Sequence, residues 1–132
     1  MELKRVVVTG LGMVTPLGND VTTTWENLLA SKSGAGAITH FDASKFKTQF
    51  ACEVKDLDVS SLFDPKELRR YDRYVHLAIH SAEQAIQDAG IQMENEDPLR
   101  CGVIYGSGMG GVHTLDVNIG AYATGDGTPR YS

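Results

Sequence analysis

The chain has 132 residues and a formal net charge of −5 at pH 7, with 42% hydrophobic and 22% charged residues. These values are typical of one acidic globular domain with a buried core, and they argue against a nucleic-acid-binding protein or a disordered chain. The N-terminal residues lack the apolar run of a signal peptide, and no segment resembles a membrane span. We therefore expect a cytoplasmic protein.

Three segments are predicted to be strands. Residues 5–9, RVVVT, are rich in β-branched side chains, which is typical of a strand buried on both faces of a parallel sheet. Residues 101–105, CGVIY, form a second candidate, and residues 50–54, FACEV, form a shorter one.

Three helices are also predicted. The first covers about residues 22–30, where apolar side chains recur at helical spacing behind threonines able to cap the helix. The longest begins at Pro65, with Asp64 as the capping residue, and continues without a break until Gly90. The third covers residues 112–124. The order strand, helix, helix, strand, helix predicts an α/β fold.

Glycines follow the two main strand candidates, and a dinucleotide-binding loop is one interpretation of them. Such a loop needs G-x-G-x-x-G between a strand and a helix, with an acidic residue about twenty positions later. The first loop has Thr15 where the third glycine should be. The second loop has the glycines but only Asp126 as a distant acid; its glycines are Gly106, Gly108 and Gly111. We expect tight turns at strand ends here, with a nicotinamide-dependent reductase as the weaker alternative.

The sequence offers few catalytic or metal-ligating candidates. Cys52 and Cys101 lie within or beside apolar strand candidates, so both are predicted to be buried free thiols. His76 and His80 are four residues apart on one predicted helix, but the glutamate of a zinc-protease helix is missing between them. We expect packed or solvated histidines there and no metal site. The other two histidines are isolated in the sequence.

Taken in order, the segments resemble the β-ketoacyl-acyl-carrier-protein synthase family of fatty-acid biosynthesis, and most closely its synthase II members. The resemblance runs the whole length of the chain and is carried by order and spacing more than by any single motif. The segments that carry it are RVVVTGLGMVTPLGND, TWENLLASKSG, ITHFDAS, RRYDRYVHLAIHSAEQAIQDAGI and CGVIYGSGMGG.

This resemblance implies a fold and a reaction. Residues 1–132 would be the opening part of the first half of a thiolase-like fold, with αβαβα layers. The family condenses malonyl-carrier protein with acyl-carrier protein by decarboxylative Claisen chemistry through an acyl-cysteine intermediate, with no bound cofactor or metal. The family's nucleophilic cysteine, histidines and lysine would all lie downstream. We therefore expect the segment alone to contain no catalytic residue and to be inactive.

The resemblance also implies two contributions from this segment. Met109, with Gly108 and Gly110 beside it, would lie next to the acyl pocket as a flexible apolar gate.

A cluster of basic residues would meet the acidic helix of acyl carrier protein, although a charge run alone is usually a solvated helix face. Its members Lys66, Arg69 and Arg70 match the family's docking residues, Arg73 lies on the same side of a continuous helix, and Arg130 would join them.

The resemblance further implies a homodimer. The acidic composition and the lack of a long apolar run predict no binding to nucleic acid or membrane. A non-catalytic partner of a synthase, of the chain-length-factor type, remains an alternative.

Overall fold

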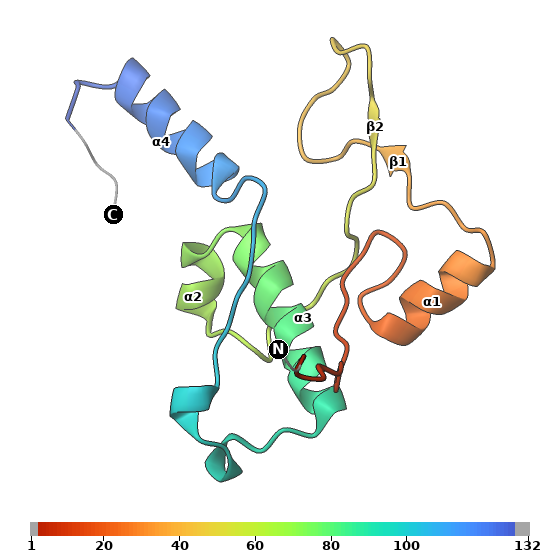
Figure 1. The fold of residues 1–132 in the computed structure, drawn as a ribbon. Coiled ribbons are helices and arrows are strands. Elements are labelled where there is room, and N and C mark those ends of the chain that lie inside the picture. Colours follow the sequence, from red (N-terminus) through yellow and green to blue (C-terminus); the bar gives the residue numbers. More distant parts are fainter. Residues whose placement is uncertain (1–2, 129–132) are drawn as a thin grey trace.

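The computed structural model describes residues 3–128 and combines helices with a small sheet (Figure 1). Strands β1 and β2 pair antiparallel, with Gly36 opposite Ala51 and Ala37 opposite Phe50. No helix in the described range is long and apolar enough to cross a membrane. The elements are α1 Val21–Leu29, β1 Gly36–Ala37, β2 Phe50–Ala51, α2 Pro65–Arg70, α3 Arg73–Ala89, the 3-10 turns η1 Met93–Asn95 and η2 Pro98–Arg100, and α4 Val112–Thr124.

The ends of the helices follow local capping chemistry. Helix α1 is confirmed, but its cap is Asp20 rather than a threonine. The backbone N–H and the hydroxyl of Thr23 each donate to the Asp20 carboxylate at 2.7 Å. These bonds stabilise the ionised form and hold the pKa of Asp20 below its usual value. Helix α3 ends at Gly90, as predicted, in the left-handed conformation with φ of 64°.

The long predicted helix is divided in two, which corrects the prediction of a continuous helix. Tyr71 and Asp72 adopt extended backbone angles between α2 and α3. The ring of Tyr71 contacts Phe63 edge to face, with 6.1 Å between ring centroids. Phe63 belongs to the small apolar core with Ala43 and Val59. A tertiary contact with the core therefore accompanies a break that helix periodicity did not predict.

The strand predictions for residues 5–9 and 101–105 are wrong for the structure as described, and only Phe50–Ala51 of residues 50–54 is a strand. Val6 and Ile104 are almost fully exposed, at 91% and 101%. A run of this kind becomes a buried strand only when other strands pair with its edges and helices cover its faces. Within residues 3–128, no strand pairs with either run.

Residues 10–13, which follow the first run, and Tyr105 of the second run lie against α3. Leu11 donates its backbone N–H to the Asp88 carboxylate at 2.8 Å. On the second run, the Tyr105 hydroxyl lies 3.3 Å from the Ser81 hydroxyl. A Cβ atom at Gly12 would overlap the carbonyl oxygen of Ser81. Gly10 and Gly12, which we call the first glycine cluster, therefore permit close contact between the backbone and α3.

Candidate functional site

The second glycine cluster, residues 106–111, forms a turn before α4. Its C-terminal glycines pack closely against neighbouring side chains, and its N-terminal glycines have open space around them. A Cβ at Gly110 would lie 3.0 Å from Cζ of Tyr74, so the turn packs closely against this ring. Gly111 has φ of 69° and precedes the first residue of α4. By contrast, a Cβ at Gly106 or Gly108 would meet no atom within 4 Å among the described residues. Met109, between these two parts, is 78% exposed.

The start of α4 is occupied by a carboxylate from the break between α2 and α3. Thr114 donates its hydroxyl to Oδ1 of Asp72 at 2.8 Å, and a Cβ at Gly111 would lie 3.1 Å from Oδ2. Asp72 makes no side-chain capping bond to its own helix. A negative charge at a helix N-terminus is favourable, and it repels a phosphate that would bind there. This arrangement disfavours the dinucleotide interpretation of the glycines.

The basic residues predicted as a docking face divide between two helices. Lys66, Arg69 and Arg70 are exposed on α2. Glu67, the acid among them, accepts the backbone N–H of Asp64 at 3.1 Å in a capping box. Within residues 3–128, no carboxylate forms an ion pair with either arginine. These positive charges are therefore available to a partner.

Arg73 lies beyond the break, on α3, and therefore does not continue the face of α2. Its Nη2 donates to the backbone carbonyl of Val54 at 2.6 Å, which anchors the guanidinium to the segment after β2. Arg130, the remaining predicted docking residue, lies outside the described residues.

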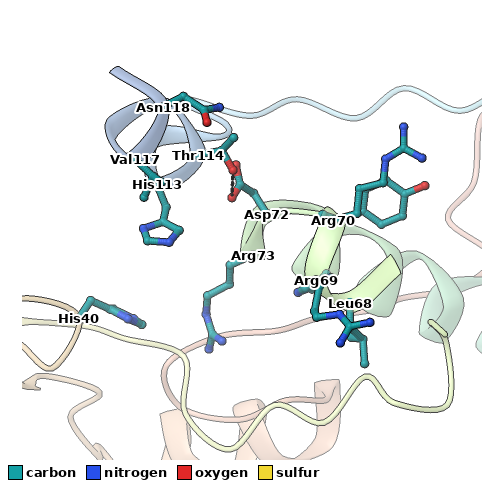
Figure 2. A pocket seen from close by; sticks show the side chains of 12 residues that line it. His40, Leu68, Arg69, Arg70, Asp72, Arg73, His113, Thr114, Val117 and Asn118 are labelled. Atoms are coloured by element: carbon teal, nitrogen blue, oxygen red, sulfur yellow. Dashed lines mark hydrogen bonds between the residues drawn. The ribbon is translucent and has the colours of Figure 1, made fainter. Parts of the chain in front are cut away.

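A pocket of about 750 Å³ joins the ends of α2, α3 and α4 and is rich in cationic or protonatable side chains (Figure 2). It contains two histidines that are isolated in the sequence, His40 and His113, because the fold brings together positions more than seventy residues apart. No local sequence signal indicates this meeting. The pocket is lined by His40, Leu68, Arg69, Arg70, Tyr71, Asp72, Arg73, His76, His113, Thr114, Val117 and Asn118.

Acidic groups in or near the pocket are already engaged. Glu53 accepts the backbone N–H and the hydroxyl of Thr39 at 3.0 and 2.7 Å, and these bonds lower the pKa of Glu53. Its Oε1 is also 3.9 Å from Nε2 of His40. Asp72 is held by Thr114. These bonds come from neutral groups and leave both carboxylates negative, but the lining contains three arginines, Arg69, Arg70 and Arg73, against one carboxylate, Asp72, so its net charge is positive.

The remaining candidates behave as packing residues or exposed thiols. The ring of His76 contacts Phe63, with 4.9 Å between centroids, and Nε2 of His80 lies 3.3 Å from the carbonyl oxygen of Asn19. Among the described residues, no three His, Cys, Asp or Glu side chains are placed to hold a metal ion. Both cysteines are exposed, which corrects the prediction of buried thiols. Cys101 begins the run at residues 101–105, with which no strand of the described residues pairs, and Cys52 directly follows β2.

Comparison with known proteins gives consistent matches. The family model described as "Beta-ketoacyl synthase, N-terminal domain" matches residues 3–129. A 3-oxoacyl-[acyl-carrier-protein] synthase 2 of Coxiella burnetii is 48% identical over 124 residues, which are 94% of this chain and 30% of that protein. The protein of the same name from Synechocystis sp. is 43% identical over 116 residues, 88% of this chain and 28% of that protein. This chain thus spans about 30% of the length of these relatives.

One solved structure supports the fold assignment. The ishigamide ketosynthase/chain length factor superposes with a TM-score of 0.61 and 32% sequence identity. The superposition covers 67% of this chain and 22% of that one. Together with the helices and strands of the described residues, this similarity supports an α/β fold of the ketosynthase type.

Proposed function

Because this chain belongs to the β-ketoacyl synthase family, over the N-terminal domain of that family, we propose that it is part of a 3-oxoacyl-[acyl-carrier-protein] synthase. The observation that carries this proposal is the family match over residues 3–129. Residues 1–132 would form the opening part of the first half of a thiolase-like fold.

The proposed reaction lengthens an acyl chain by two carbons. A cysteine thiolate of the synthase, outside these 132 residues, accepts the acyl group from the carrier-protein thioester. Malonyl-carrier protein then loses carbon dioxide, and the resulting carbon nucleophile attacks the acyl thioester and releases the thiolate. Division into transfer and condensation is covalent catalysis.

The first role of this chain in that reaction is to dock the carrier protein. Lys66, Arg69 and Arg70 form an exposed basic face on an otherwise acidic chain, and the capping box keeps Glu67 away from the arginines. An acidic partner helix could bind Arg69 and Arg70 without displacing a carboxylate of the described residues. Exposed ion pairs contribute at most about 1 kcal/mol each, so the face orients the partner and speeds association more than it tightens binding. By the family resemblance, Arg130 would be a further docking residue.

The second role is to gate the acyl pocket. Tyr74 and Asp72 restrain the turn at Gly110 and at the residue after it, whereas Gly108 has open space around it. Met109 lies between the restrained and the open part. A flexible thioether at this position suits a side chain that must move to admit a longer acyl chain.

The docking role is tested by charge reversal in a complete synthase polypeptide that contains this chain. The double variant Arg69→Glu/Arg70→Glu should raise the KM for acyl-carrier protein about tenfold or more, because two attractions become repulsions. Its KM for an acyl N-acetylcysteamine thioester, which has no carrier protein, should not change. The matched control Lys45→Glu/Lys47→Glu makes the same charge change on the loop between β1 and β2. An equal KM increase in both double variants at low salt contradicts specific docking on α2.

A second candidate is a non-catalytic synthase partner, favoured by the similarity to a ketosynthase/chain length factor structure. The intact mass of the complete polypeptide after incubation with acyl-carrier protein separates the two. A covalent acyl adduct supports the synthase, and its absence under conditions that acylate a known synthase supports the partner.

A further inference from the structure

The basic pocket has a second end, defined by His40, Arg73 and His113, that lies apart from the docking residues of α2. These three side chains come from the segment after β1, the start of α3 and the first turn of α4, and they point toward a common space (Figure 2). The hydrogen bond from Arg73 to the Val54 carbonyl holds its guanidinium in place. One bond leaves most of the five N–H donors of that group unused.

Two carboxylates, Glu53 and Asp72, lie near this end of the pocket. His40 has Glu53 at 3.9 Å, and that carboxylate already accepts two hydrogen bonds from Thr39. Asp72, next to Arg73, is held by Thr114 at the start of α4. The other titratable side chains lining the pocket are His76, Arg69, Arg70 and Tyr71. Glu53 and Asp72 keep their negative charges, but Arg69, Arg70 and Arg73 supply three positive charges in the same pocket, so an additional carboxylate from outside would meet a net positive charge.

The shape and position of this end indicate the kind of ligand. The pocket volume of about 750 Å³ is within the range of ligand-binding clefts and admits more than one side chain. It is continuous with Arg69 and Arg70, which line the same pocket. An arginine fork binds a carboxylate in two parallel hydrogen bonds, and protonated imidazoles add charge.

We propose that the end of the pocket formed by His40, Arg73 and His113 receives a carboxylate side chain of the docked acidic carrier protein, and that docking tightens as the pH falls from 8 to 6. This inference rests on the proposed docking function and extends it by three residues. It assigns the histidines no part in the condensation chemistry.

The test is the dissociation constant for holo-acyl carrier protein at pH 8, 7 and 6 and low salt, measured with the complete polypeptide by fluorescence anisotropy. Carboxylates of the partner stay ionised in this range, whereas histidines gain charge. Binding should tighten about threefold to fivefold from pH 8 to pH 6, the effect of one or two exposed ion pairs. The variant His40→Gln/His113→Gln should lose this dependence and bind as the parent does at pH 8.

His80→Gln is the matched control, because His80 contacts Asn19 and does not line the pocket; it should keep the pH dependence. Parent binding that is independent of pH overturns the inference without any variant, as does pH dependence that survives in the double variant. In either case a loss of binding in Arg69→Glu/Arg70→Glu leaves the proposed docking function standing. No binding of the parent at any pH contradicts both.

Discussion

The close contact between the first glycine cluster and α3 makes Gly12→Ala a severe perturbation. A Cβ at Gly12 would overlap the carbonyl oxygen of Ser81 and lie 2.7 Å from the backbone nitrogen of Ala85, whereas an ordinary contact is 3.4–4 Å. The segment must therefore move away from α3. The hydrogen bonds of its neighbours would lengthen as it moves, from Leu11 N to the Asp88 carboxylate at 2.8 Å and from Met13 N to the side-chain amide oxygen of Gln84 at 3.3 Å.

The expected cost follows from these contacts. Each lost hydrogen bond is worth about 1 kcal/mol, and overpacking at a tight contact costs about 1–3 kcal/mol. Gly12→Ala should thus lower the free energy of unfolding by about 3 kcal/mol or more in urea titrations followed by circular dichroism. Gly102→Ala is the control, because a Cβ there meets no atom within 4 Å; its effect should stay within about 0.5 kcal/mol. Equal stability of the two variants would refute the packing of this segment on α3.

Two further predictions concern the cap of α1 and the gate. Asp20→Ala should lower the free energy of unfolding by about 1 kcal/mol at pH 7 by removing the bonds to Thr23. Because the folded state lowers the pKa of Asp20, this contribution is present above the usual aspartate pKa and is lost as the pH falls through the lowered value. Urea titrations at neutral and strongly acidic pH should show the variant and the parent converging in acid, and a difference that persists there contradicts the cap. Met109→Phe in the complete synthase should reduce turnover of the longest accepted acyl chain about tenfold relative to short chains, measured by mass spectrometry of the products, because a rigid ring would narrow the proposed acyl pocket. Met93→Phe, on the exposed turn η1, should leave the product distribution unchanged, and an unchanged distribution in Met109→Phe contradicts the gate.

Features governed by neighbouring residues were predictable from the sequence. The capping box of Asp64 and Glu67, the end of α3 at Gly90 and the bounds of α4 all follow from signals within a few positions. Residues 5–9 illustrate the opposite case. Their β-branched pattern indicates a strand, but a strand also requires hydrogen-bonding partners, which no local pattern supplies.

In the candidate site, too, some features follow from neighbouring residues and others from tertiary structure. The basic residues of α2 are recognisable because they are close together in the sequence. The break at Tyr71 and Asp72 is accompanied by contacts with Phe63 and Thr114, which helical periodicity alone does not predict. The meeting of His40 with the start of α4 depends entirely on tertiary structure.

The most direct measurement of the central claim is condensation by the complete polypeptide that contains this chain. Purified protein would be incubated with malonyl- and acyl-carrier protein, and the carrier-protein products would be identified by intact mass spectrometry. A β-ketoacyl synthase should form a 3-oxoacyl-carrier protein two carbons longer than the acyl substrate, with release of carbon dioxide and without a nicotinamide cofactor. Absence of this product under conditions in which a known synthase 2 forms it would contradict the proposed function.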